Sequence, residues 1–212
     1  MAYPVAVTIE PQYDNRNRLT TAFRLILAIP HLLLVGGIGV GVAFSGGSGG
    51  GSRTSLTGES GLLGAVAWIL AVISWFTILI LGEHMPAIRR FTRFYLRWRV
   101  RALAYLMLLE DPYPPFGDAP YPASLELTEA TLPRDRLSVG LRLILAIPHL
   151  IVYFFVLCAW MLTSIAAWFI ILFTGSYPRG LYEFGVGALT WRIRVEAYVL
   201  LMVDEYPPFS LS

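Results

Sequence analysis

Two histidines stand at equivalent places of a repeated motif and could ligate a metal ion or a haem. His31 and His149 each follow a proline inside an apolar stretch, and neutral imidazole is a common ligand of such groups. The alternative is structural: proline leaves a backbone carbonyl without its donor, and the neighbouring histidine can bond to that carbonyl or to a lipid headgroup. We favour the structural role and expect no cofactor.

Adjacent carboxylates precede the Tyr-Pro-Pro-Phe segment at the end of each half of the chain. They are Glu110-Asp111 and Asp204-Glu205. Paired carboxylates can carry acid–base catalysis, but neighbouring residues of an extended segment point to opposite faces. We therefore expect them to pair with arginines of the aromatic basic segment. The chain has no nucleophile-elbow, zinc-protease, P-loop or dinucleotide-binding motif, so we predict that it is not an enzyme.

A stripe of arginines predicts a helix that lies in the membrane interface. The stripe recurs every four residues over 88–109, which places it on one helical face. The arginines would face phosphates, and aromatic residues such as Trp98 would face acyl chains. The segment is either a general surface anchor, which we favour, or a specific anionic-lipid site. The stripe consists of Arg89, Arg93, Arg97 and Arg101, and the second half keeps Trp191, Arg192 and Arg194.

Arg24 and Arg142 are further candidates for contact with lipid. Each lies about two turns before a repeated histidine, near the predicted membrane surface. Such an arginine can extend its side chain toward the headgroups, or it can pair with Glu83 or Glu183 at the end of the neighbouring helix. We favour the first alternative.

These residues belong to a tandem repeat. Residues 24–32 recur unchanged at 142–150, an offset of 118 (142 − 24), whereas Trp75-Phe76 recurs at Trp168-Phe169, an offset of 93 (168 − 75). The first half therefore holds 25 additional residues (118 − 93), which include the Gly/Ser run at 46–52, typical of a flexible linker. We assign repeat one to 1–117, with the insertion at about 45–61, and repeat two to 118–212.

Each repeat must supply the elements that position these side chains. A short strand, at 5–9 or 123–127, precedes a long apolar stretch. The runs 23–44 and 62–81 are each long enough to cross the ~30 Å hydrocarbon core. The run 139–174 is barely long enough for two helices with a turn near 159–164, and we predict such a hairpin. A shallow re-entrant pair, or one steeply tilted helix kinked at Pro148, are the alternatives.

The predicted fold is thus a mostly α membrane protein with four spans. Arginines flank the membrane ends away from the glycine loop, so the positive-inside rule places both termini in the cytoplasm. Ser48 and Ser210 would then lie on opposite sides of the membrane. We expect strands 5–9 and 123–127 to join the extended ends 113–116 and 206–209 in one small sheet, across a pseudo-twofold axis along the membrane normal.

Composition agrees with a membrane location. The chain of 212 residues is 56% hydrophobic and 14% charged, with a mean hydropathy of +0.63, whereas soluble domains carry about 25% charged residues. A net charge of +2 does not indicate nucleic-acid binding. The single cysteine, Cys158, excludes a disulfide framework.

The repeated motifs resemble bacterial membrane proteins of the DUF4389 family, a domain of unknown function. The motifs are Arg-x5-Pro-His, Trp-Phe-x5-Gly, Trp-x2-Arg-x2-Ala-Tyr and Asp-x-Tyr-Pro-Pro-Phe, and each occurs twice. The resemblance covers nearly the whole chain. The resemblance implies a bacterial inner-membrane protein and supplies no activity. In this sequence the motifs begin at Arg24, Trp75, Trp98 and Asp111 and again at Arg142, Trp168, Trp191 and Asp204.

The leading hypothesis is a non-enzymatic inner-membrane protein that serves as an accessory or scaffolding subunit. Its expected partners are membrane lipids and a protein of the same complex, and not nucleic acid. Abundant aromatic residues suit such surfaces, and few polar residues are available to form an ion path. The alternatives are a lipid-binding or lipid-transport protein and a cofactor-ligating subunit that uses His31 and His149.

Overall fold

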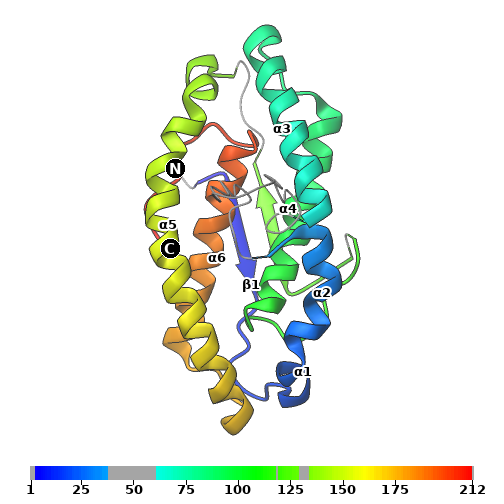
Figure 1. The fold of residues 1–212 in the computed structure, drawn as a ribbon, viewed down its shortest axis with the longest axis vertical. Coiled ribbons are helices and arrows are strands. Elements are labelled where there is room, and N and C mark those ends of the chain that lie inside the picture. Colours follow the sequence, from blue (N-terminus) through cyan, green and yellow to red (C-terminus); the bar gives the residue numbers. More distant parts are fainter. Residues whose placement is uncertain (1–2, 38–60, 118, 129–133, 212) are drawn as a thin grey trace, which may run out of the picture.

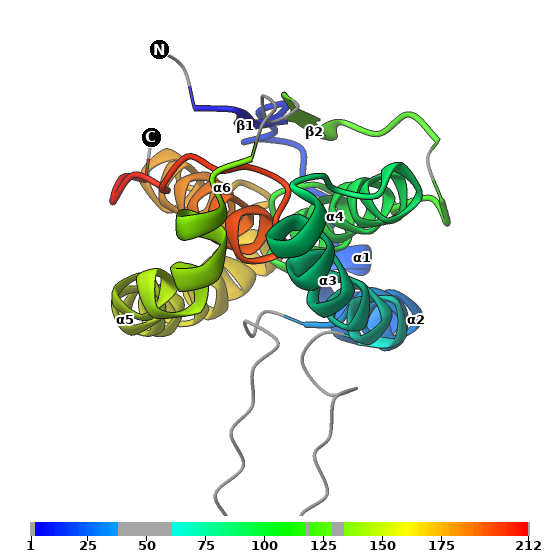
Figure 2. The same ribbon diagram turned by 90° about the horizontal axis from the view of Figure 1, so that it is seen from above.

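The computed structural model describes residues 3–37, 61–117, 119–128 and 134–211. The described chain is mostly helical, and its outer helices run along the full length of the molecule (Figure 1). Seen along that length, it has three layers: a small sheet, an inner pair of helices and an outer pair of long helical segments (Figure 2). Most of the predicted insertion at 45–61, and Ser48 within it, lie outside the described residues. The helices are α1 (Arg18–Ala22), α2 (Arg24–Val35), α3 (Gly61–Leu81), α4 (Pro86–Leu106), α5 (Arg136–Thr174) and α6 (Arg179–Val199).

The helical hairpin predicted for residues 139–174 is wrong, because α5 is one continuous helix of 39 residues. At 1.5 Å per residue it is about 58 Å long. The Asp135 side chain caps its start by accepting hydrogen bonds from two backbone N–H groups. Residues 159–164 contain no glycine or proline that would turn the chain, and one buried stripe continues from Val139 to Ile171. The long single helix, which was the alternative, is what forms.

In repeat one, α2 and α3 together take the place of α5. α3 begins where α2 ends and continues along the same side of the molecule (Figure 1). Gly36 and Gly61 have positive φ, and a Cβ on Gly61 would lie 2.4 Å from the backbone nitrogen of Gly36. Arg99 of α4 donates to the carbonyls of Val35 and Gly37, which lack helical donors. The first hairpin, and the four-span topology based on both hairpins, are therefore also wrong.

The two repeats meet in a two-stranded antiparallel sheet. β1 (Val5–Ile9) pairs with β2 (Ala123–Leu127), with Val7 opposite Leu125. Those two residues hold the same position in the two repeats (7 + 118 = 125), so a pseudo-twofold axis passes through the pair. The predicted pairing of strands 5–9 and 123–127 is confirmed. The predicted addition of segments 113–116 and 206–209 is wrong, because their aromatic side chains pack against histidines instead.

Residues 88–109, which we predicted to form a surface helix in the membrane interface, belong to an inner helix that other elements cover. α4 packs between β2 on one side and α2 and α3 on the other, and Figure 2 shows the same order of layers. Tyr95 is 0% exposed and Trp98 is 7% exposed, because both find polar partners inside the protein. Of the predicted stripe, Arg101 is buried and donates to the Gly117 carbonyl at 2.8 Å. The other three, Arg89, Arg93 and Arg97, are half-buried.

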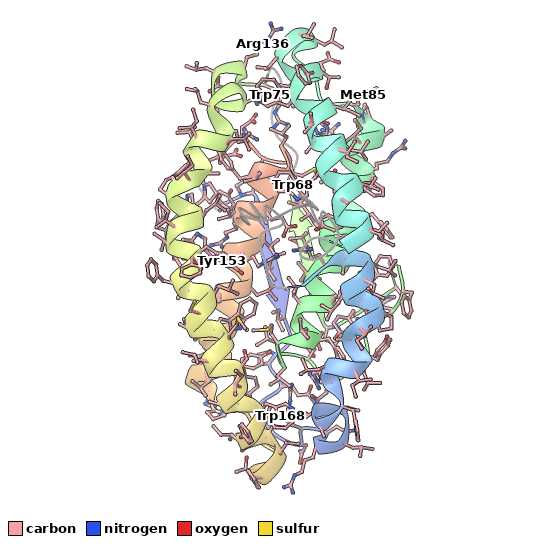
Figure 3. All side chains as sticks on the ribbon, in the orientation of Figure 1. Trp68, Trp75, Met85, Arg136, Tyr153 and Trp168 are labelled. Atoms are coloured by element: carbon pink, nitrogen blue, oxygen red, sulfur yellow. The ribbon has the colours of Figure 1, made fainter. Side chains whose placement is uncertain are left out.

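The ends of the outer helices are held by two equivalent tryptophans. Trp75 Nε1 donates to the Val139 carbonyl at 3.0 Å, and Trp168 Nε1 donates to the Thr21 carbonyl at 2.9 Å. These tryptophans lie at opposite ends of the molecule (Figure 3). Each repeat thus holds the start of the other repeat's long helix, and the two outer segments run antiparallel.

Candidate functional site

Each repeat buries two arginines around one aspartate. In repeat one, Arg24 Nη2 lies 2.7 Å from Asp111 Oδ1, and Arg16 Nη2 lies 3.0 Å from the same oxygen. Arg24 also donates to the carbonyls of Tyr105, in the last turn of α4, and of Glu110, just beyond that helix. These contacts join the start of α2 to the end of α4. We call the groups the arginine–aspartate clusters: Arg16, Arg24 and Asp111, and, in repeat two, Arg134, Arg142 and Asp204.

In the second cluster, Arg142 repeats the contacts of Arg24 at the equivalent residues. Arg142 donates to the carbonyls of Tyr198 and Val203 at 3.1 and 2.8 Å, and to Asp204 Oδ1 at 2.8 Å. Arg134 Nε lies 2.6 Å from Asp204 Oδ2. The Arg142 guanidinium also lies over the Tyr198 ring, 4.4 Å from its centroid. Conserving the same contacts in both repeats indicates that they position the helices.

Neither repeated arginine extends toward lipid headgroups. Arg24 and Arg142 are each 1% exposed, so the favoured prediction of a headgroup-seeking side chain is wrong. Their carboxylate partners are Asp111 and Asp204 rather than Glu83 and Glu183. A buried guanidinium needs nearby acceptors for its five donors, and the carbonyls at the end of a helix supply them. The aspartates do pair with arginines, although not with the arginine stripe.

Each repeated histidine is enclosed by aromatic residues of its own repeat. Trp98 Nε1 donates to His31 Nδ1 at 3.0 Å, and the Phe116 ring stacks on His31 with centroids 4.5 Å apart. In repeat two, Phe209 stacks on His149 with centroids 4.0 Å apart, and the edge of Trp191 lies nearby.

The fold does not bring the two histidines to one site. α2 and α5, which carry them, lie on opposite sides of the molecule (Figure 2), and each ring contacts the inner helix of its own repeat. A haem or metal ion held by both His31 and His149 would need their rings to converge. Among the residues that the structure describes, no group of three or more histidine, cysteine or acidic side chains could hold a metal ion.

One carboxylate between the inner helices serves two arginines. Arg99 and Arg192 hold the same position in the two repeats (99 + 93 = 192). Arg99 Nε lies 3.0 Å and Arg192 Nη1 lies 2.8 Å from Glu196 Oε2. The Tyr95 hydroxyl donates to Glu196 Oε1 at 3.0 Å. Leu103 stands where repeat one would place a second glutamate (196 − 93 = 103), so the group is asymmetric.

Four further predicted lipid candidates make contacts within the protein. Trp98 and Trp191 are 7% and 3% exposed and belong to the protein core. Arg192 belongs to the group around Glu196. The half-buried Arg194 lies over the Tyr3 ring, 5.5 Å from its centroid.

Sequence analysis missed several members of the buried network. Arg16 could have been identified, because Arg134 repeats it at the same offset of 118 as Arg24 and Arg142. Glu196 could not, because repeat one has leucine at that position. Glu110 was identified together with Asp111 and expected to pair with arginine, but its separate burial could not be predicted, because repeat two has Val203 at that position (110 + 93 = 203).

Glu110 is a buried carboxyl without a close ion pair. It is 2% exposed, and its Oε1 accepts no hydrogen bond from the described residues. Burial raises the pKa of Glu110 from 4.5 to about 7, and the nearby Arg16 offsets only part of this effect. The fold therefore favours the neutral carboxyl, which agrees with the valine at the equivalent place in repeat two.

The outer surface of the long helices is apolar. α5 carries no aspartate, glutamate, lysine or arginine from 143 to 174, and neither do α2 from 25 to 35 or α3 from 62 to 81. Large side chains are widely exposed there: Phe155 is 67%, Leu162 is 69% and Ile80 is 70% exposed. We call the exposed side of α2, α3 and α5 the apolar face. α3 and α5 are long and apolar enough to cross a membrane, judged by length and composition.

A cavity of about 460 Å³ opens between α2 and α5, next to the C-terminal end of α4. Its volume is within the range of ligand pockets, and its wall is apolar except for Arg24 and Ser164. Ser164 is 9% exposed, and its Oγ has no hydrogen-bond partner among the described residues. Repeat one has bulkier Trp68 in place of Met161 and Ala71 in place of Ser164 (offset 93). The apolar wall includes Leu106, Met107, Met161 and Ile165.

The sequence profile of the family described as Domain of unknown function (DUF4389) matches the chain twice, at residues 60–117 and 136–210. The two matches lie in the two repeats, as expected for a tandem repeat of the family unit. No curated protein and no solved structure matches the chain.

Removing the shared aspartate should destabilise the protein. Asp111→Asn leaves two buried arginines without their counter-charge, and breaking a buried ion pair costs about 3–5 kcal/mol. Asp204→Asn should cost less, because the Asp204 side chain is 21% exposed against 9% for Asp111. Thermal unfolding in detergent micelles measures both, with the exposed Glu183→Gln as the control. Wild-type stability in all three variants would refute the structural role.

Replacing Glu110 should change how stability depends on pH. The folded state binds the Glu110 proton more tightly than the unfolded chain, so ionisation destabilises the fold as the pH rises from 4.5 to about 7. Glu110→Gln should equal the wild type near pH 4.5 and be more stable at pH 8, by up to about 3 kcal/mol. Unfolding at both pH values, with exposed Glu205→Gln as the control, tests this. A stability difference that is the same at both pH values would contradict it.

Proposed function

Because the chain belongs to the DUF4389 family, whose description names no activity, we propose a function from the geometry. The protein is a non-enzymatic membrane protein that buries its apolar face in lipid and serves as an accessory or scaffolding subunit of a membrane assembly. The observation that carries the proposal is the apolar face itself. Exposing an apolar surface that extends over three helices to water is energetically unfavourable, so the surface indicates contact with a membrane or with another protein.

The distribution of polar groups supports a lipid-facing surface. The side of the sheet that faces away from the helices exposes Thr8, Ser124 and Glu126, and the apolar face lies on the opposite side of the molecule (Figure 2). The buried ion pairs lie between these two surfaces. A molecule that is polar on one side and apolar on the other is suited to a boundary between water and hydrocarbon.

The buried charges support a structural role. Asp111 and Asp204 are held in the arginine–aspartate clusters, and Glu196 binds two arginines and a tyrosine. These groups join helices to one another and stabilise their positions. In the described part of the chain the sheet has two strands, so each strand has an outer edge to which a partner protein could add a strand.

The arginines favour a cytoplasmic location for the sheet side. All 16 basic residues are arginine, and none lies on the exposed apolar stretches of the outer helices. By the positive-inside rule, their side of the molecule faces the cytoplasm. This agrees with the bacterial inner membrane that the family resemblance implies.

Charge on the apolar face should weaken membrane binding. The double substitution Phe155→Lys and Leu162→Lys places two ammonium groups where we expect hydrocarbon, and each costs up to about 3 kcal/mol. We expect at least about a tenfold loss of protein that floats with liposomes, after allowance for side chains that reach the headgroups. Thr8→Lys with Ser124→Lys, on the sheet, is the matched control and should float like the wild type. Equal flotation of both variants would rule out the apolar face as the lipid contact.

A second function, lipid binding, is favoured by the cavity beside Arg24. It opens among exposed apolar residues of α5, such as Ile165 and Phe169, so an acyl chain can enter it from the bilayer. Ser164 and Arg24 are the polar residues of its wall. At the place equivalent to Met161, repeat one has the bulkier Trp68, which would fill such a cavity.

Filling the cavity should displace a bound lipid. Met161→Trp copies the residue of repeat one, and native mass spectrometry of the purified protein should then show less retained lipid than the wild type. Leu162→Trp is the control, because its side chain is 69% exposed outside the cavity. If both variants retain the same lipid as the wild type, the cavity is not a lipid site.

A further inference from the structure

The apolar stretch of α5 exceeds the thickness of a bilayer. Residues 143–174 of α5 contain no aspartate, glutamate, lysine or arginine and extend over about 48 Å. The hydrocarbon core is about 30 Å thick. A spanning α5 would have to tilt by about 50° to keep this stretch in hydrocarbon, which is beyond the usual range of 0–40°.

The position of the sheet in the molecule argues against an orientation in which the long helices span the membrane. The pseudo-twofold axis passes through Val7 and Leu125, and β1 lies near the middle of the long axis of the molecule (Figure 1). If the long helices crossed the membrane, the sheet would lie at the centre of the bilayer. Its exposed Ser124 and Glu126, and the unpaired backbone groups of its outer edges, would then face lipid. Lipid-exposed sheet edges do not occur at that depth.

Charge is present at both ends of the long helices. Exposed Arg18 and Arg179 lie at the end where α5 finishes, and exposed Arg90 and Arg136 lie at the end where α5 starts. The pseudo-twofold axis relates these two ends. A spanning protein usually concentrates arginine on one side of the membrane, whereas this protein carries exposed arginines at both ends of its long helices.

We infer that the protein lies flat in a single leaflet, with α2, α3 and α5 parallel to the membrane plane and the sheet in water. This inference rests on the proposed function and specifies how the apolar face meets the bilayer. In this orientation the pseudo-twofold axis coincides with the membrane normal. Both ends of each long helix reach the headgroups of the same leaflet, and all the sheet groups are hydrated.

Depth measurements along α5 test the orientation. Ile144, Phe155 and Phe173 are exposed by 63%, 67% and 78%, and their spacings of 11 and 18 residues place them on one helical face. Each is changed to cysteine in the full-length Cys158→Ala protein, spin-labelled and reconstituted in vesicles of phosphatidylethanolamine and phosphatidylglycerol. Collisions with oxygen and with a water-soluble nickel chelate give the depth of each label. Ser124→Cys on the sheet is the water-exposed control.

We expect similar depths at the three α5 positions, all within one leaflet. A spanning helix would give a profile in which Phe155 is deepest and the two outer positions approach water on opposite sides. That profile would overturn the flat orientation and leave the membrane role in place. Labels that collide with nickel as freely as the Ser124 control would overturn both the orientation and the proposed function.

Sidedness provides an independent measurement. Glu83 and Glu183 are exposed and lie near opposite ends of the long helices. As single cysteines in intact right-side-out or inverted vesicles, both should react with a membrane-impermeant maleimide in the same vesicle preparation. Reaction of Glu83→Cys in one preparation and Glu183→Cys in the other would show that the helices cross the membrane.

Discussion

The fold depends on the need to satisfy a buried guanidinium at the start of each outer helix. Arg24 and Arg142 are almost fully buried, so their charged guanidinium groups need acceptors within the protein. Their Nη groups find these acceptors in carbonyls at the ends of α4 and α6 and in one aspartate per repeat. Because the arginine is on one helix and its acceptors follow another, this single requirement sets the position of the outer layer on the inner layer. The histidine and aromatic contacts farther along α2 and α5 then maintain the same packing.

The same arrangement explains why so much apolar surface stays exposed. Each outer helix contributes one narrow stripe to the protein core, which in α5 runs from Val139 to Ile171. Small residues in that stripe, such as Ala146 and Ala167, allow the helix to lie close to its neighbours. The rest of its circumference has no protein to cover it. The inner helices are covered on both sides, and this is why they can carry charged groups that are paired away from solvent.

Sequence reasoning recovered the features that the repeat makes visible. The identity of residues 24–32 and 142–150 led to the internal symmetry and to the pairing of the two strands. It failed for the outer helices, because an apolar run specifies an apolar environment and leaves open whether the helix turns back. It also failed for Arg24, whose partner Asp111 is 87 residues away and can be identified only from tertiary structure. The group around Glu196 was not predicted for another reason. The two repeats differ at that position, so comparing them could not identify it.

The register of the sheet has a consequence for the ancestry of the chain. Val7 opposite Leu125 means that the two copies meet through the same surface, as the subunits of a symmetric homodimer do. Neither copy is complete alone, because each supplies a strand and a tryptophan to the other. A single-copy ancestor would therefore have formed this architecture as a dimer, and duplication within one gene would have made the association permanent. In that dimer every substitution near the axis occurred twice. In a fused chain the two copies can differ, so Glu196 can serve both arginines while its equivalent position holds Leu103, whereas a symmetric dimer would place two like charges near the axis.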